Sequence, residues 1–502
     1  MKISLSEVFA IPKRSNILTR MHGGFSKLVF KESDNELPFA FMLITLMSSC
    51  GISPYESFKR LRSIKILPFI QKESCEIVRQ VEVLNRDPLT AMLQRADETD
   101  SKIYGDSLRG YVSTVQSGGS VTSYLKSKLR SIFEIQAEAA VRSIGTLETL
   151  VEAYMVMLIV LLCIYILATV MSSTAMFSNA LGLNFGGPSL VYAILFLIMP
   201  SMSIMFMFLA HLTRKGTIMG LRSIYHKAFP PAIASAILLV LYILVPQIQV
   251  TMNILGVPIF TTTCLVAISL FPMISYRRMI GLNIKAEESM PSFLRDISEA
   301  RKTGMSPEKS IVHGATRKGY GAFSKILQRM VTQLEWGVSL RKIYEDMKER
   351  IRSWPVLTNF IILIETIEVG GGSSDALELL AGYSEKIRDI EKNKRDMLKA
   401  YVILPFIWSV LMSLTFTFTF YVMTQIATLY LPQNPSASLG SEIGIFSSAL
   451  ILQCWLSGFF IGKVIQGTFA AGFEYSILLA AVSLASLLFS QNITSILIGA
   501  LV

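Results

Sequence analysis

The segment GISPYES, residues 51–57, returns 253 residues later as GMSPEKS, residues 304–310. The tripeptide Gly-Gly-Ser at 118–120 returns at the same distance, at 371–373. Identical pairs at this offset outside the tripeptide include Pro38/Pro291, Gly51/Gly304, Ser53/Ser306, Pro54/Pro307 and Ser57/Ser310. A repeat of this length redefines the expected fold. We therefore expect two copies of one unit, each a polar block that leads into an apolar helix.

The repeated segment carries the signals of a helix end and a new helix start. In GMSP, glycine suits the end of one helix, serine caps the next, and proline suits its first turn. Downstream of the second glycine cluster, Leu377, Leu379, Leu380 and Tyr383 have helical spacing. Neither block shows the alternating pattern of strands. We expect each polar block to form an antiparallel helical bundle that continues into a membrane helix.

Composition excludes an ordinary soluble enzyme, a disordered chain and a disulfide-stapled secreted domain. The chain has 502 residues, of which 52% are hydrophobic and 17% are charged. Soluble domains carry about 25% charged residues. Runs of about 20 uncharged apolar residues can cross a bilayer as helices. Such windows predict seven spans, at about 150–173, 190–210, 231–247, 254–275, 402–425, 443–462 and 474–491.

The predicted fold is an all-α, multi-pass membrane protein with two repeated helical-bundle domains. We expect five regions: an N-terminal extension at 1–35, the first bundle at 36–148, four membrane helices in 149–275, the second bundle at 276–401 and three membrane helices in 402–502.

The distribution of basic residues predicts the orientation in the membrane. All 47 Lys and Arg residues fall on one side of the predicted spans. The four segments on the other side, 174–189, 248–253, 426–442 and 492–502, contain none. Basic loops stay in the cytoplasm. The N-terminus and both bundles are therefore expected in the cytoplasm of a cell-membrane protein, with the C-terminus outside.

A search for catalytic chemistry finds nothing to nominate. The chain has no phosphate-binding G-x-x-x-x-G-K-[ST] motif, no paired zinc histidines and no C-x-x-C pair. The middles of the predicted spans hold no Asp, Glu, Lys, Arg or His, although such residues mark proton relays and substrate paths. We expect no catalytic residue, metal, cofactor or nucleic-acid partner.

Two alternatives from other classes stay open. A transporter or channel on a duplicated scaffold would need polar residues along a cavity. Thr261–Thr263 and Thr415, Thr417 and Thr419 are the nearest candidates, but helical geometry spreads each set around its helix. Hydrogen bonding to the backbone explains them better. A membrane enzyme is the third class, and no residue supports it.

Two basic groups are candidate surfaces for a protein partner or for lipid. The first, in the loop 211–230, consists of Arg214, Lys215, Arg222 and Lys227. The second shares one face of the helix that leads into the fifth span: Arg388, Lys392, Arg395 and Lys399. Membrane topology and lipid anchoring explain much of this charge without a partner.

The corresponding helix of the first copy is acidic, with Glu134 and Glu138. We hypothesise that it faces the basic helix of the second copy, within one chain or across a dimer. The alternative is that each helix is separately solvated, where ion pairs contribute about 0–1 kcal/mol.

The remaining candidate residues are glycines at turns and at helix contacts. Gly118, Gly119, Gly370, Gly371 and Gly372 are expected to form turns between helices, or hinges. In the membrane, Gly458 and Gly462 are spaced for close helix packing, within the chain or in a homodimer.

Three motifs of the second copy carry a family resemblance. They are Gly304-Met-Ser-Pro307, Leu334-Glu-Trp-Gly-Val-Ser-Leu340 and Ile367-Glu-Val-Gly-Gly-Gly372. The chain resembles platform proteins of the type II secretion system F family, in the archaeal branch that serves type IV pili and the archaellum. In the first copy, Asn85–Leu89 stands two residues out of register with the second motif. The third motif has Ile367 in place of the family's glycine.

The resemblance implies an assembly platform in the membrane with no catalysis of its own. Such proteins are thought to bind a hexameric secretion ATPase from the cytoplasm and to pass its motion to pilin or archaellin subunits. On this reading the second bundle and the loop 211–230 would dock the ATPase, and the pilins' apolar helices would pack against the spans.

Overall fold

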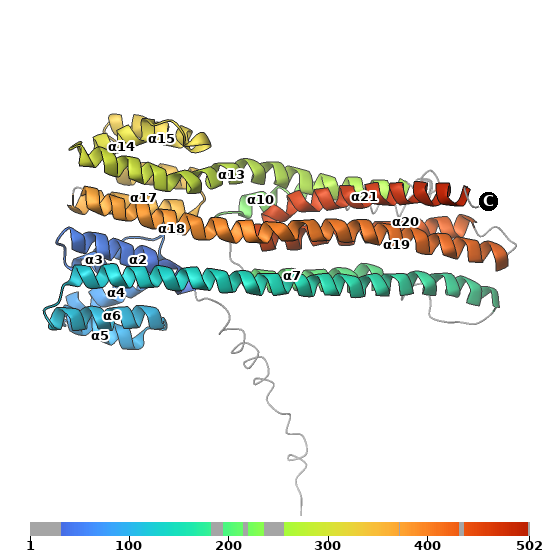
Figure 1. The fold of residues 1–502 in the computed structure, drawn as a ribbon, viewed down its shortest axis with the longest axis horizontal. Coiled ribbons are helices and arrows are strands. Elements are labelled where there is room, and N and C mark those ends of the chain that lie inside the picture. Colours follow the sequence, from blue (N-terminus) through green and yellow to red (C-terminus); the bar gives the residue numbers. More distant parts are fainter. Residues whose placement is uncertain are drawn as a thin grey trace, which may run out of the picture. The chain divides into compact units, whose positions relative to one another are not determined.

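A computed structural model describes residues 32–181, 194–213, 219–234, 256–370, 372–430 and 436–499 (Figure 1). In these ranges the regular structure is helical and no β-strand occurs. The described residues fall into two compact units. The first contains residues up to Phe41 together with Tyr55–Ala139, and the second contains Met42–Pro54 and the described residues from Ala140 onward.

The first unit is a helical bundle. Its helices are the start of α2 (Glu32–Ser49), then α3 (Pro54–Leu61) from Tyr55 onward, α4 (Pro68–Glu82), α5 (Pro88–Glu98), α6 (Lys102–Gln116) and the start of α7 (Val121–Leu181). Local sequence defines the helix starts. The Asp87 carboxylate accepts hydrogen bonds from the amides of Leu89 and Thr90, and the Ser101 hydroxyl accepts one from Tyr104. The buried side chains that join the helices include Leu37, Phe58, Ile77, Leu108 and Leu129.

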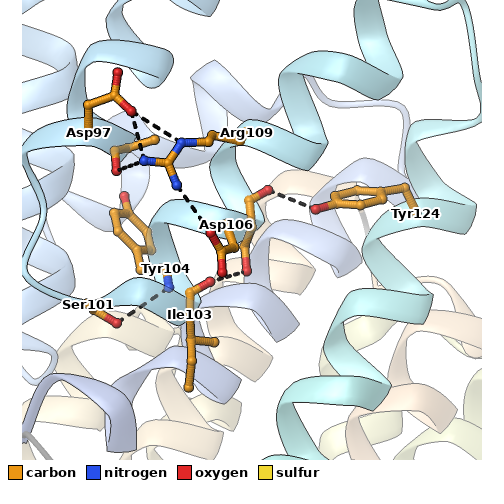
Figure 2. A network of polar contacts seen from close by, with 9 residues as sticks. Asp97, Ser101, Ile103, Tyr104, Asp106, Arg109 and Tyr124 are labelled. Carbon is orange, nitrogen blue, oxygen red and sulfur yellow. Dashed lines mark hydrogen bonds and ion pairs between the residues drawn. The ribbon is translucent and has the colours of Figure 1, made fainter.

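Glycines let α6 lie close to both of its neighbours in this unit. A Cβ on Gly105 would lie 2.7 Å from the carbonyl oxygen of Ala96, and one on Gly110 would overlap the Tyr124 hydroxyl. That hydroxyl donates to the carbonyl of Ser107 at 2.9 Å (Figure 2).

Arg109 ties the same helix to α5. Its guanidinium binds Asp97 at 2.8 Å, Asp106 at 3.1 Å and the carbonyl of Ala96 at 3.1 Å (Figure 2). Most of these groups are exposed, so the network adds less to stability than the apolar contacts beneath it.

The second unit contains the second bundle. Its elements are the end of α13 (Gly256–Lys302), α14 (Pro307–Thr316), η2 (Gly321–Phe323), α15 (Ser324–Glu335), α16 (Leu340–Arg350), α17 (Trp354–Gly370) and α18 (Ser374–Lys399). Phe293, Phe323 and Phe360 form an aromatic core, with ring centroids 5.8–6.3 Å apart.

The helices of the two bundles match at the offset seen in the sequence. The bounds of α4, 68–82, shifted by 253 residues, fall on 321–335, which η2 and α15 occupy. The starts of α3 and α7 fall in the same way on the starts of α14 and α18. Gly51 and Gly304, which end the preceding helices, have φ of 82° and 85°. The predicted duplication is confirmed.

Six helices of the described residues are long and apolar enough to span a membrane. They lie in α7, α9 (Met199–Thr213, preceded by η1, Ile194–Ile198), α13, α19 (Ile403–Tyr430, joined to α18 by η3, Ala400–Val402), α20 (Ser436–Gln466) and α21 (Phe469–Gly499). The prediction of an all-α, multi-pass membrane protein is confirmed. The predicted third span, 231–247, lies mostly outside the described residues, so the count of seven stays a prediction.

Helices α20 and α21 pack closely against each other in the membrane part. A Cβ on Gly458 would overlap the backbone of Ser476, and one on Gly462 would overlap the backbone of Gly472. Small residues of this kind let two backbones approach in a membrane. Because both glycines are used within the chain, their spacing gives no separate support to a homodimer.

Candidate functional site

Two of the turns that carry the sequence motifs meet at one end of the second bundle. The first turn, Thr303–Ser306, follows α13, and the third turn, which precedes α18, contains Gly372. The guanidinium of Arg301 donates to the carbonyl of Gly372 at 2.9 Å. The Ser298 hydroxyl donates to the carbonyl of Ser374 at 3.0 Å. The end of α13 and the start of α18 are thus bound side by side.

Arg341 brings the remaining motif turn, Trp336–Ser339, to the same place. It lies in the first turn of α16, directly after that motif turn. Its guanidinium binds Glu365 at 2.6 Å and Glu368 at 2.8 Å, both near the end of α17. The three motifs, far apart in sequence, therefore converge. We call the three turns together the tip of the second bundle.

The tip is the end of this bundle away from the apolar membrane segments. Helix α13 carries its apolar segment at its start and reaches the tip at Lys302. Helix α18 begins at the tip and leads through η3 into the apolar α19 (Figure 1). Both long helices therefore connect the tip directly to the membrane part.

The motif residues are required by the turns that they form. Gly304, Gly337 and Gly372 have φ of 85°, 76° and 62°, a backbone region that side chains with a Cβ disfavour. Ser306 and Ser373 then cap α14 and α18 by accepting backbone hydrogen bonds. The family resemblance thus rests partly on helix boundaries.

Ion pairs satisfy much of the charge at the tip. The Glu365 side chain has no solvent exposure, and its carboxylate is held by the half-exposed Arg341. Glu368 shares the same guanidinium, and Lys302 binds Glu378 at 2.5 Å. Glu368 lies within the third motif, whereas nothing in the sequence selects Glu365 or Arg341, because neither lies in a position that a pattern distinguishes.

Trp336 is the most exposed large apolar side chain among the described residues, at 84%. It stands in the α15–α16 turn, next to Gly337. The corresponding α4–α5 turn of the first copy presents Val83 and Leu84, which are 72% and 53% exposed. Aromatic side chains of this kind often anchor protein interfaces. The signal was present in the sequence, as a tryptophan before a glycine turn in a polar domain, but sequence analysis did not use it.

Comparison with known protein families identifies the family of this chain. The family model for the type II secretion system (T2SS), protein F, matches residues 40–169 and 293–421, slightly more than half of the chain. The chain belongs to the type II secretion system protein F family. Members of this family are membrane platform proteins of type II secretion and type IV pilus-like systems. All three tip motifs lie inside the second matched range.

A relative of this chain is an uncharacterized protein, MJ1286, of Methanocaldococcus jannaschii. It is 25% identical over 398 residues, which cover 74% of this chain and 66% of the relative. No solved structure matches the chain significantly.

The predicted basic loop is described in part. Arg214 and Lys215 lie outside the described residues. Arg222, in α10 (Arg222–His226), and Lys227 are exposed, and the Lys227 ammonium donates to the Ser275 hydroxyl at 3.0 Å.

The predicted basic face of α18 is largely neutralised. Arg388 binds Glu385 and Asp389, Arg395 binds Glu287 at 3.4 Å, and Lys399 binds Asp396 at 2.6 Å. Lys392 is exposed. Most of these carboxylates come from α18 itself, so the face offers a partner less positive charge than the four basic residues suggest.

The predicted pairing of the acidic and basic helices stays a prediction. In the first unit, Glu134 binds Arg130 at 3.2 Å, one turn earlier on the same helix, and Glu138 is exposed.

The predicted glycine turns are located as follows. Gly118, with φ of 71°, and Gly119 lie between α6 and α7, and Gly372 lies between α17 and α18. Gly370 is the last residue of α17, so it belongs to the helix, and Gly371 lies outside the described residues. A hinge at these positions stays a prediction.

The membrane threonines donate to the backbone. The hydroxyls of Thr261, Thr262, Thr263, Thr415, Thr417 and Thr419 each bond to a carbonyl three or four residues earlier. In the described ranges, no group of three or more His, Cys, Asp or Glu side chains could hold a metal ion.

Proposed function

We propose that this protein is the platform of a type IV pilus-like assembly machine in the cell membrane. It docks a hexameric secretion ATPase from the cytoplasm and couples the ATPase's motion to the insertion of pilin or archaellin subunits into a filament. Hydrolysis belongs to the ATPase, and the platform itself is not an enzyme. Family membership supports this role, because protein F family members work with secretion ATPases and pilin-like subunits.

The charge distribution supports the orientation in this proposal. All basic residues fall on one side of the predicted spans, and basic segments are retained in the cytoplasm. The N-terminus and both bundles then meet the ATPase, and the C-terminus lies outside.

The observation that carries the proposed docking is Trp336 at the tip. The tip points away from the membrane segments of its own unit, so a soluble protein can reach it. The neighbouring charges of Arg341 and Lys302 are paired, which leaves an apolar anchor as the main feature for recognition. A tryptophan that becomes buried in an interface contributes about 2 kcal/mol or more.

The membrane helices offer an apolar surface to pilins and to lipid. Phe418 and Phe489 are each about two-thirds exposed in α19 and α21. The apolar helix of a pilin can pack on such a surface with no polar group to desolvate. Arg222 and Lys227, near the membrane part, provide charge for anionic lipid head groups.

Co-purification tests the proposal. The tagged full chain is extracted in detergent, and the secretion ATPase of the same organism is measured in the eluate for wild type, Trp336→Ser and Met397→Ser. Met397 is a matched control, since it is 53% exposed on α18 but lies away from the tip. We expect wild type and Met397→Ser to retain the ATPase and Trp336→Ser to lose at least about 90% of it.

The dependence of ATPase binding on salt concentration distinguishes the two candidate docking surfaces. Binding through Trp336 persists at high ionic strength, whereas binding through Arg222 and Lys227 falls steeply because salt screens exposed charge. Failure of the wild-type chain to retain the ATPase, or uptake of a solute by the purified protein alone in vesicles, would overturn the proposed function.

A further inference from the structure

A second polar cluster lies at the opposite end of the second bundle from the tip. It joins the turn between α16 and α17 to the loop that follows α9. The amide of Met219 donates to the carbonyl of Arg352 at 2.8 Å, and the Arg352 guanidinium donates to the carbonyl of Gly220 at 2.9 Å. Gly220 has φ of 68°, and a Cβ there would overlap the guanidinium. Both backbone and side chain of Arg352 therefore bind this loop.

A buried asparagine on α13 fixes the same turn. Asn283 has no solvent exposure. Its side-chain oxygen accepts the amides of Arg352 at 2.8 Å and Ser353 at 3.0 Å, and its side-chain nitrogen donates to Met279 at 2.8 Å. A buried amide with such partners fixes both its own orientation and that of the turn.

Glu287, one turn further along α13, completes the cluster. It accepts the Ser353 hydroxyl at 2.7 Å and pairs with Arg395 of α18 at 3.4 Å. Helices α13, α17 and α18 are thus held together where the bundle faces the membrane part. We call the loop 219–227 with Asn283, Glu287, Arg352 and Ser353 the base joint.

The loop side of the base joint is packed on the membrane helices. Ile224 forms a small buried cluster with Tyr276, Ala470 and Ala471, which belong to α13 and the start of α21. The Tyr276 hydroxyl donates to Gln466, at the end of α20, at 2.8 Å. The base joint therefore has the bundle on one side and the α20–α21 connection on the other.

The first copy has different residues at the positions that correspond to Arg352 and Asn283. The residue before Ser101, at the start of α6, is Asp100, whereas the residue before Ser353, at the start of α17, is Arg352. The position of Asn283, shifted by 253 residues, is Phe30.

We infer that Asn283 and Arg352 are positioning residues that lock the second bundle to the loop 219–227, so that displacement of the bundle reaches the membrane helices. This inference rests on the proposed function, in which the ATPase moves that bundle. The bundle continues into the membrane part through two long helices, α13 and α18, and long helices are rarely straight. A further attachment, through Arg352 and Gly220, keeps the bundle and the loop together, so that displacement of the bundle moves the membrane part.

The first test separates docking from coupling. Asn283→Leu and Arg352→Ala are compared with Arg350→Ala as the control, because Arg350, the last residue of α16, pairs with Asp346 of its own helix at 3.6 Å. Membrane level, ATPase recovery and filament number are measured. We expect the two joint variants to keep the ATPase but to lower filament number at least tenfold, with the control unchanged.

The second test asks whether the contact itself is needed. In a background with Cys50, Cys75, Cys163, Cys264 and Cys454 replaced by serine, Met219→Cys and Arg352→Cys are combined. The two backbones are hydrogen-bonded, which brings the cysteines within reach of a disulfide. We expect filaments to be lost under reducing conditions and restored after a membrane-permeant oxidant forms the cross-link, although the Arg352 side chain is absent.

The outcomes distinguish the two proposals. Loss of ATPase recovery from the wild-type chain refutes the proposed function. Normal filament number in Asn283→Leu and Arg352→Ala refutes the inference while the proposed function stands. Should those variants not reach the membrane, the cross-linked pair decides, and a cross-link that fails to restore filaments counts against the inference.

Discussion

Asn85 and Gly337 occupy the same position in the two copies of one turn. Asn85 has φ of 51° and Gly337 has φ of 76°. Asn85 is the one non-glycine residue with positive φ in the described part of the chain. It stands three residues after the end of α4, whereas Gly337 stands two residues after the end of α15. The first copy therefore has one extra residue in this turn, and the side chains that fill it, Val83 and Leu84, are exposed.

This pair predicts how Gly337 tolerates substitution. A Cβ on Gly337 would meet nothing within 4 Å, so the cost comes from the backbone alone. Gly337→Ala is expected to destabilise the protein by about 1–2 kcal/mol, and Gly337→Asn by less, because asparagine tolerates this region. Thermal unfolding in detergent measures both. Equal melting temperatures for wild type and the two variants would contradict the assignment of strain to this turn.

Gly462 should resist even the smallest side chain. Its Cβ would overlap the backbone of Gly472, so Gly462→Ala has to separate α20 from α21. Overpacking of this kind costs about 1–3 kcal/mol. Gly382→Ala, in α18, is the control, because a Cβ there meets nothing and alanine favours a helix. We expect the melting temperature of Gly462→Ala to fall below that of wild type, and that of Gly382→Ala not to fall. A decrease for Gly382→Ala with no decrease for Gly462→Ala would exclude the close contact.

Arg341→Ala tests the ion pairs of the tip. The change removes charge-assisted hydrogen bonds to the buried Glu365 and to Glu368, worth about 2 kcal/mol in all once the exposure of Arg341 is considered. Arg341→Lys should recover part of this, since lysine keeps the charge but loses the planar fork. Lys342→Ala, at an exposed neighbouring position, serves as the control. If Arg341→Ala and Arg341→Lys have the same melting temperature as wild type, the ion pairs of Arg341 with Glu365 and Glu368 contribute nothing to stability.

The carboxyl of Glu287 should make the base joint sensitive to pH. Burial is the main cause of its raised pKa, opposed by Arg395 and by the Ser353 hydroxyl. A raised pKa in the folded state means that the folded protein binds the proton more tightly than the unfolded chain does. This group therefore favours folding below its unfolded pKa, and that contribution is lost as pH rises through the folded pKa.

Glu287→Gln removes this dependence and keeps an acceptor for Ser353. The melting temperature of the variant relative to wild type should rise between pH 4 and pH 7. Glu288→Gln, at the adjacent half-exposed position, is the control. A difference between Glu287→Gln and wild type that does not change with pH would show that Glu287 does not titrate in this way.

Much of the architecture follows from local sequence. The Gly-x-Ser-Pro segments at 51 and 304, the capping serines and the uncharged apolar runs each specify their structure within a few residues or one helix length, and the repeat then fixes the fold class. Local patterns also led to an overestimate of the positive charge that α18 offers to a partner. The four basic residues of α18 share a face, but Arg388 and Lys399 are paired with carboxylates on the same helix and Arg395 with Glu287, 108 residues away.

The sequence by itself determined that this chain is a duplicated, all-helical membrane protein, because helix periodicity, caps and transfer of apolar residues from water act over short stretches. The tertiary structure decided which residues work together. Arg341 reaches Glu365, Arg352 reaches Gly220, and Gly462 meets Gly472 through helix packing that brings distant segments within a few ångströms. Such contacts depend on the lengths and angles of whole helices, and no short pattern records them.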